Sequence, residues 1–248
     1  MEDGCAAGYS DYKAHYTLDA RSIVDPEALP PVFWESERRR LQTLVRLFGE
    51  IRGQRVLDVG CGSGWLTRLL AERGARVVAL DMALSGVKGA RHRVESRSVH
   101  SAFLVGDIYH LPFATDAFDG AVLSEVAEHL EDLDRGLEEI ARLLKSGGQL
   151  VISVPNNELL RWHLCIHCNR LTPANAHIRN FTEKSLKTKL EDHGFTVLKV
   201  AKISNKMLEH LRFPVWTGRL PYPIWRAWDA VLNVLSRKSA FLAAVAIK

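Results

Sequence analysis

The feature that most constrains this chain is a short apolar run breaking into three alternating glycines, Val56-Leu-Asp-Val-Gly-Cys-Gly-Ser-Gly64. Because the run is short, rich in β-branched residues and followed by glycine, it predicts a buried parallel strand that ends in a tight turn. Gly60, Gly62 and Gly64 permit positive φ and let the backbone approach a ligand with no Cβ in the way. A helix expected from Trp65 would point its N-terminal amides at the same place. The pattern therefore predicts a ligand site where the first strand ends.

A second apolar run, Val77–Leu80, follows after one helix length and ends at Asp81. A carboxylate at the end of the second strand can bind both hydroxyls of a ribose, so a nucleoside-type cofactor is expected. The dinucleotide fingerprint Gly-x-Gly-x-x-Gly would require glycine at position 65, where Trp65 stands instead. A nicotinamide-dependent oxidoreductase therefore remains an alternative on the glycine pattern alone.

The glycine run resembles motif I of the class I S-adenosylmethionine-dependent methyltransferases. Further segments resemble the later motifs of that family in the same order, over roughly residues 50 to 155 with weaker matches beyond. They are Gly106–Ile108, Leu111–Phe113, Phe118–Asp119, Val122–Glu125, Glu128–Leu130 and Leu144–Gly148, then Phe181–Thr182 and Gly194–Phe195. The resemblance implies an α/β fold, a doubly wound, mostly parallel sheet of seven strands, with S-adenosylmethionine as the cofactor.

The resemblance also implies a cofactor-binding role for each matched residue. Asp58 would orient the methionine end, Asp81 would hold the ribose, and Asp107 would accept a hydrogen bond from the adenine amino group. The alternatives are that Asp58 satisfies loop amides at a strand end and that Asp107 is a solvated loop acid. The complete set is Asp58, Gly60, Cys61, Gly62, Gly64, Asp81, Met82, Asp107, Ile108 and Glu125.

Methyl transfer from a sulfonium needs an aligned acceptor and exclusion of water, and it needs no protein nucleophile. A base can still deprotonate the acceptor, and His129 is the candidate because the ordinary pKa of histidine lies near neutrality. The alternative is that His129 only packs the loop before a helix that starts at Asp132.

Cys165 and Cys168 have the spacing at which two thiolates can share one zinc ion. Some methyltransferases of this superfamily look similar here, and His177 matches a histidine downstream of their CxxC pair. A fourth ligand would be His163, His167 or water, and the zinc would pin a loop over the active site. The alternative is that these thiols and histidines line a substrate pocket without a metal.

The alternation of strands and helices predicts one domain over residues 1–248, with a parallel sheet covered on both faces. Residues 1–50 are expected to form a helical segment whose Tyr12 and Tyr16 either close over the cofactor or form a surface turn. Residues 157–181 and 204–238 would cap the substrate.

Strands are expected at 55–60, 76–81, 102–106, 119–124, 149–154, 195–201 and 241–247, and the last of these is expected to be antiparallel. Helices are expected near 33–48, 133–145 and 182–194, and Gly147–Gly148 is expected to end the second of them.

A helix over residues 223–237 carries one polar stripe and is apolar around the rest of its circumference. Its apolar side is expected to be buried on the domain or to roof an apolar acceptor pocket. The combination of tryptophan and arginine also suggests a membrane-interfacial helix or a dimer face. Both interpretations favour an apolar or lipid-like acceptor.

Composition excludes several classes of function. A net charge of +4 is too small for a nucleic-acid footprint, and no apolar stretch reaches the length of about 20 residues that spans a bilayer. The acidic N-terminus and four unevenly spaced cysteines predict a cytoplasmic protein. Ser124–Ala127 stands where an Asn-Pro-Pro-Tyr-like motif of nucleic-acid enzymes would be. The sequence therefore predicts methyl transfer to a small or lipid-like acceptor, with oxygen favoured over carbon and nitrogen as the methylated atom. The alternatives are a methyltransferase acting on RNA or protein and a non-catalytic subunit with the same fold; the oligomeric state is not predicted.

Overall fold

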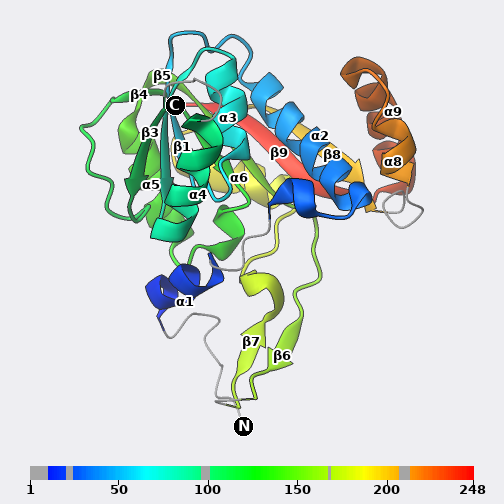
Figure 1. Cartoon of the computed structure of the whole chain (residues 1–248), viewed down its shortest axis with the longest axis horizontal. Helices are drawn as coiled ribbons and strands as arrows, with labels where there is room; N and C mark the ends of the chain where they lie inside the picture. The colour runs from blue at the N-terminus through cyan, green and yellow to red at the C-terminus, as the bar shows by residue number, and fades with distance from the viewer. Residues whose placement is uncertain (1–10, 21–24, 96–100, 167–168, 207–212) are drawn as a thin grey trace.

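Seven strands form one central sheet in the order β3-β2-β1-β4-β5-β9-β8 (Figure 1). The computed structural model describes residues 11–20, 25–95, 101–166, 169–206 and 213–248. The first five strands are parallel, and β9 runs antiparallel to both of its neighbours. The predicted fold class is therefore confirmed. The strands are β1 Arg55–Val59, β2 Arg76–Asp81, β3 Ser101–Val105, β4 Phe118–Ser124, β5 Leu144–Pro155, β8 Thr196–Asn205 and β9 Ser239–Ile247.

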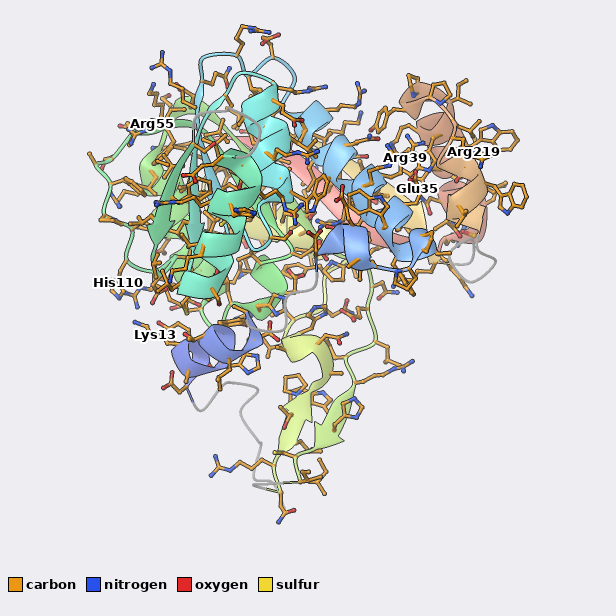
Figure 2. All side chains as sticks on the ribbon, in the orientation of Figure 1. Lys13, Glu35, Arg39, Arg55, His110 and Arg219 are labelled. Carbon is orange, nitrogen blue, oxygen red and sulfur yellow. The ribbon has the colours of Figure 1, made fainter. Side chains whose placement is uncertain are left out.

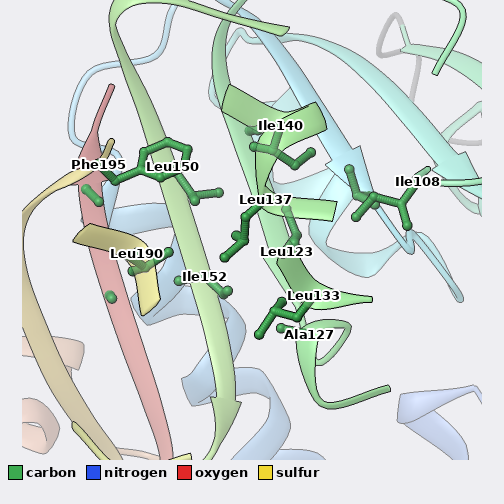
Figure 3. Close-up of a cluster of buried hydrophobic side chains, with 14 of the residues drawn as sticks. Ile108, Leu123, Ala127, Leu133, Leu137, Ile140, Leu150, Ile152, Leu190 and Phe195 are labelled. Atoms are coloured by element: carbon green, nitrogen blue, oxygen red, sulfur yellow. The ribbon is translucent and has the colours of Figure 1, made fainter. Parts of the chain in front are cut away.

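Helices cover both faces of this sheet, which is why its strands read as almost continuous apolar runs. Val56 packs in the cluster with α2 and α3, whereas the next residue, Leu57, packs in the cluster with α5 and α6. Figure 3 shows part of the second cluster, with Leu133 and Leu137 of α5 facing Leu150 and other strand residues. The helices are α2 Pro31–Leu47, α3 Trp65–Glu72, α4 Leu84–Glu95, α5 Leu133–Leu143 and α6 Glu183–Asp192.

Helix α5 ends before the glycine pair that was expected to terminate it. Leu144 is already extended and pairs with Phe118 at the start of β5. Gly147 has a φ of +76° within the first part of β5. The pair therefore shapes the start of β5, and the helix stops at Leu143 because strand pairing begins at Leu144.

The connector after β5 contains a short antiparallel hairpin that the sequence did not predict. Its strands β6 (Trp162–Leu164) and β7 (Leu171–Pro173) have three residues each, too few for a periodic pattern. The hairpin projects from the body of the molecule (Figure 1).

The C-terminal helices α8 (Phe213–Thr217) and α9 (Tyr222–Ser236) lie at the β8 edge of the sheet (Figure 1). The polar stripe of α9 faces inward: Asp229 accepts a hydrogen bond from the Ser204 backbone at 3.3 Å, and Asn233 accepts one from the Asn205 side chain at 2.9 Å. Since the end of β8 carries buried polar groups, it requires polar partners. The expectation that the apolar side of this helix is buried is wrong.

That apolar side is consequently exposed. Trp228 is 60% exposed and Leu235 is 75% exposed. Ile224, Val231 and Val234 are exposed as well. Trp225 is the exception; it is buried, with the Arg39 guanidinium 5.1 Å from its ring centre. No helix in the described ranges is long and apolar enough to cross a bilayer.

Candidate active site

A cavity opens at the carboxyl ends of the central strands, where the winding of the sheet reverses between β1 and β4. Open α/β sheets bind ligands at this position. One side of the cavity is formed by helix α1 (Tyr12–Asp19) and the residue after it. Its lining residues are Tyr16, Asp19, Ala20, Val59, Gly60, Gly62, Leu80, Asp81, Met82, Gly106, Ile108, Glu125, Val126, His129 and Leu130.

The glycine loop needs its glycines for two different reasons. Gly64 has a φ of +77°, and a Cβ there would lie 2.6 Å from the Cα of Ala90, so glycine allows α3 to pack against α4. A Cβ on Gly62 would meet only a backbone oxygen at 4.0 Å, so this part of the loop faces open space. The loop is therefore packed on one side and accessible on the other.

Asp81 connects this loop to the end of β2. Its carboxylate accepts hydrogen bonds at 2.9 Å from the backbone amides of both Gly62 and Ala83. Burial raises the pKa of Asp81, and these amides oppose the shift. The carboxylate lies in the cavity wall, where the sequence predicted it.

Asp58 does not line the cavity. It is 1% exposed and accepts a 2.5 Å hydrogen bond from the Thr67 hydroxyl in α3. Burial raises its pKa to about 6. This geometry is that of a strand-end carboxylate satisfying local donors; the orienting role of Asp58 stays a prediction. The predicted Cys61, Gly64 and Asp107 also lie outside the described lining.

Asp107 is held by the N-terminal helix. The Tyr12 hydroxyl donates to Asp107 Oδ2 at 2.7 Å, and Lys13 Nζ lies 3.2 Å from the same oxygen. Tyr16 donates to the His129 carbonyl at 3.2 Å, so α1 contacts both ends of the cavity. Figure 2 shows Lys13 on α1, on the side of the sheet where His110 also lies. Helix α1 and the residue after it thus form one wall of the cavity, and the role of α1 as a lid stays a prediction.

Glu125, which lines the cavity, has an unusual backbone conformation. Its φ is +56°, a left-handed value that costs a residue with a Cβ of order 1 kcal/mol and is often found at functional sites. Its carboxylate accepts a 2.9 Å hydrogen bond from Ser153, and Arg40 lies 3.6 Å away. Burial raises the pKa of Glu125, whereas Arg40 opposes the shift.

Arg40 is a site residue that sequence reasoning missed. It is 5% exposed although its position in α2 lies off the apolar stripe, and it donates to Ser124 at 2.5 Å and to Ser153 at 2.9 Å. Its neighbour Arg39 is also buried and forms an ion pair with Glu35. Figure 2 labels Arg39 and Glu35. Only the long-range fold reveals these partners, since no local spacing signals them.

His129 lies beside the cavity with its tautomer fixed by one contact. Nδ1 lies 3.1 Å from the Ala176 carbonyl oxygen, which can only accept, so Nδ1 carries the proton and Nε2 has the lone pair. The pKa of His129 is lowered to about 4, mainly by burial and to a smaller extent by the neighbouring His177. The ring is therefore neutral at pH 7.

His177 comes from the connector and lies against His129. Their ring centres are 4.8 Å apart, and His177 Nδ1 lies 2.5 Å from a Glu158 carboxylate oxygen. Cys165 follows β6 toward the hairpin tip, whereas His177 lies beyond the base of β7. Cys168 lies outside the described residues, so the predicted Cys165–Cys168–His177 zinc set stays a prediction.

Glu128 was not singled out from the sequence, and it is completely buried. Neither of its carboxylate oxygens receives a hydrogen bond from another described residue. Burial raises the pKa of Glu128 well above its usual range, and the charge of Glu125 adds to the effect. A buried carboxylate without donors is costly and calls for an explanation.

Comparison with known proteins gives one family. A family described as "Methyltransferase domain" matches residues 33–200. The chain is 38% identical over 134 residues to a ubiquinone biosynthesis O-methyltransferase of Xanthomonas oryzae pv. oryzae, covering 52% of this chain and 56% of that protein. It is 36% identical over 117 residues to a demethylmenaquinone methyltransferase of Thermobifida fusca, covering 47% and 50%. The chain thus spans about half the length of the curated relatives that it matches.

Solved structures agree on the fold. The 1,6-didemethyltoxoflavin-N1-methyltransferase of Burkholderia thailandensis, solved with S-adenosylhomocysteine, superposes with a TM-score of 0.61 at 22% identity, covering 96% of this chain and 86% of that one. At this identity the similarity concerns the fold alone.

Proposed function

The chain belongs to the class I S-adenosylmethionine-dependent methyltransferases, and from this membership we propose that it transfers a methyl group to a small or lipid-like acceptor, at an oxygen atom. The observation that carries the proposal is that one cavity contains both a surface suited to the cofactor and a group able to take a proton from an acceptor. The open glycine loop with Asp81 lies at one end, and His129 with Glu125 lies at the other.

The residues at the first end fit the cofactor. Gly62 leaves space for backbone approach, and the Asp81 carboxylate in the cavity wall suits two ribose hydroxyls. Met82 and Ile108 supply apolar surface for the adenine, and Asp107 would receive its amino group. When bound, S-adenosylmethionine supplies an electrophilic methyl carbon on a positively charged sulfur.

The second end would position the acceptor. His129 Nε2 would accept the proton of the acceptor hydroxyl, because Nδ1 is occupied by the Ala176 carbonyl. Helix α1 would exclude water, since Tyr12 and Tyr16 hold it over the cavity. The acceptor oxygen would then attack the methyl carbon while its bond to sulfur breaks.

Two observations support this class of acceptor. Val126, Leu130 and Ile108 give the cavity apolar walls between the polar groups. Two of the relatives are named for ubiquinone biosynthesis and for demethylmenaquinone methylation. A quinol or a related phenol would match both the apolar surface and the base.

The first test is a thermal shift with S-adenosylmethionine, S-adenosylhomocysteine, NAD and NADP, each alone. A ligand that binds only the folded state raises stability with the logarithm of its concentration over its Kd. We expect a rise with the two adenosyl compounds only, and a rise with NAD or NADP only would contradict the proposal. Transfer of a labelled methyl group is then compared among ubiquinol-like phenols, total RNA and an unrelated protein mixture. Labelling of RNA or protein in place of the phenols would contradict the acceptor class.

We also propose that the exposed face of α8 and α9 contacts an anionic membrane surface. Trp216 and Trp228 are 76% and 60% exposed on this face. The stretch from residue 213 to 238 contains four cations and one acid, Asp229, which is buried. Apolar side chains with tryptophan and a cationic rim are typical of interfacial helices. A membrane contact would bring a lipid-like acceptor to the enzyme.

Vesicle sedimentation tests this contact. The chain should sediment with phosphatidylglycerol vesicles and much less with phosphatidylcholine vesicles. A Trp228→Ala/Leu235→Ser variant should lose most of the binding, whereas Leu84→Ser, an exposed leucine on α4, should retain it. Equal binding by the three proteins, or none by the wild type, would refute the membrane contact.

A further inference from the structure

Glu128 and His177 converge on His129, which lines the cavity. Glu128 and His129 lie in a one-turn helix, Ala127–His129, and His177 arrives from the connector 49 residues after Glu128. One ligand atom from each lies within 4.8 Å of those of the other two. Among the described residues, no other group of three such side chains is this close.

The histidines are oriented as metal ligands are. His129 Nδ1 is occupied by the Ala176 carbonyl at 3.1 Å, and His177 Nδ1 by the Glu158 carboxylate at 2.5 Å. Each ring is therefore fixed by an outer partner on one nitrogen, which leaves Nε2 for a ligand. A carboxylate or carbonyl behind a histidine is the usual second layer of a metal site.

The third ligand would resolve the anomaly of Glu128. Its side chain is completely buried, and both oxygens lack a donor from another described residue. A buried carboxylate normally requires donors or a cation. The Glu128 carbonyl accepts a hydrogen bond from the Ile178 backbone at 3.0 Å, which holds the connector so that His177 stays beside it.

The backbone around the three residues is also unusual. Glu125 and Ala176 both have left-handed φ angles, +56° and +57°, although neither is glycine. Ala176 carries the carbonyl that orients His129, and Glu125 lies three residues before Glu128. Such strain persists only where surrounding contacts enforce it, and it gathers at functional sites.

We propose that Glu128, His129 and His177 bind one divalent transition-metal ion, with zinc as the best match, and that an open coordination position faces the acceptor. Two histidines and one glutamate with one open position are a known catalytic zinc arrangement. Ligand atoms of a tetrahedral zinc site lie roughly 3.4 Å apart, given Zn–N distances near 2.0–2.1 Å. Side-chain rotation would have to bring the ligand atoms closer by at most about 1.4 Å.

The role of the ion rests on the proposed function, whereas metal binding itself does not. An acceptor hydroxyl on the open position would lose its proton to water at a lower pKa, as metal-bound oxygens do. The oxygen then forms its bond to the methyl carbon as the carbon–sulfur bond breaks, giving the methyl ether, S-adenosylhomocysteine and a released proton. His129 would act as a ligand in this scheme and not as a free base.

The test measures metal content and affinity in the full-length chain. Protein stripped with a chelator is titrated with Zn²⁺ by calorimetry, and Co²⁺ substitution reports the ligand type by absorbance. The variants are Glu128→Gln, His177→Ala and Glu158→Gln, with Cys165→Ser as the control for the CxxC alternative. Circular dichroism and the thermal shift by S-adenosylmethionine establish that each variant is folded.

We expect one equivalent of Zn²⁺ in the wild type and in Cys165→Ser, and no thiolate-to-cobalt band. Glu128→Gln and His177→Ala should each weaken binding by more than about 100-fold, and Glu158→Gln by about 10- to 100-fold. The absence of binding by the wild type, a thiolate band, or loss of metal in Cys165→Ser alone would overturn the assignment. If Glu128→Gln fails to fold, His177→Ala decides the question.

The two proposals fail separately. Zinc binding without a thermal shift by S-adenosylmethionine would support the metal site and contradict the methyltransferase proposal. Methyl transfer to a phenol by metal-free protein, at an unchanged rate, would support the methyltransferase proposal and overturn the role of the ion.

Discussion

Tyr12 and Asp107 are 95 residues apart in the chain and joined by a hydrogen bond of 2.7 Å. Burial alone would raise the pKa of Asp107, but the donors Tyr12, Tyr109 N–H and Lys13 outweigh it and hold the pKa below its usual range. Helix α1 is therefore fastened to the carboxylate that is predicted to receive the adenine amino group. Under the proposed function, cofactor binding and the position of α1 are linked through this side chain.

Tyr12→Phe should loosen the attachment of α1. Loss of a hydrogen bond to a charged acceptor costs about 1.5–3 kcal/mol, so tryptic cleavage after Lys13 should accelerate roughly 10-fold or more. Thr17→Ala is the matched control because the Thr17 hydroxyl donates to the Lys13 carbonyl within the same helix and makes no hydrogen bond to another element that the structure describes. Equal cleavage rates for Tyr12→Phe and the control would show that the Tyr12 bond does not hold α1.

Asp81→Ala should weaken S-adenosylmethionine binding by about 1–3 kcal/mol, or roughly 5- to 150-fold in Kd. The variant loses the proposed ribose contact and also the acceptor for the Gly62 amide. Asp192→Ala, an exposed acid on α6, serves as the control. Calorimetry that gave one Kd for wild type and Asp81→Ala would remove Asp81 from the cofactor site.

Arg40→Met should destabilise the fold by about 1.5–3 kcal/mol, because it removes the charged hydrogen-bond donor of Ser153 and the cation paired with the half-buried carboxylates of Glu37 and Glu125. Arg91→Met removes a surface ion pair with Glu95 and should change stability by less than about 1 kcal/mol. Urea denaturation measures both values. A small effect of Arg40→Met, similar to that of Arg91→Met, would show that the buried network is dispensable.

Asp229 should make the wild type lose stability as pH rises. Burial raises its folded pKa to about 6 from an ordinary 3.8. A carboxyl with a raised folded pKa contributes stability that is present below pH 3.8 and is lost as pH rises through 6. Relative to Asp229→Asn, the wild type should lose about 2–3 kcal/mol between pH 4 and 7. Parallel Tm–pH curves for the two proteins would contradict this assignment.

The sheet was predictable because each strand has a recognisable local sequence pattern. Val56–Val59 and Val77–Leu80 are apolar runs bounded by glycine or acid, and their order alone implies parallel pairing. The antiparallel last strand came from the family resemblance, and the pairing confirms it. The Gly62 and Asp81 positions in the cavity follow from the same local logic, and their binding roles stay predictions.

The orientation of α9 was not predictable from its own residues. A helical stripe shows which residues share a side, but it does not show which side faces the protein. Ser204 and Asn205 determine which side faces the protein, because they lie at the end of β8 and require polar partners, which the polar stripe of α9 supplies. Likewise, no local spacing relates His177 to Glu128, because the connector joins them only after folding.

The position of β9 has a consequence for the order of folding. Residues 239–247 fill the gap between β5 and β8, so β8 pairs with no other strand of the sheet. During synthesis, the backbone groups of β8 find no strand partner until residues some 40 positions later have been made. Pairings between strands this far apart in the sequence form slowly. A ribosome that stalls before residue 239 would thus expose an unpaired strand beside an apolar helix, the type of intermediate that chaperones recognise.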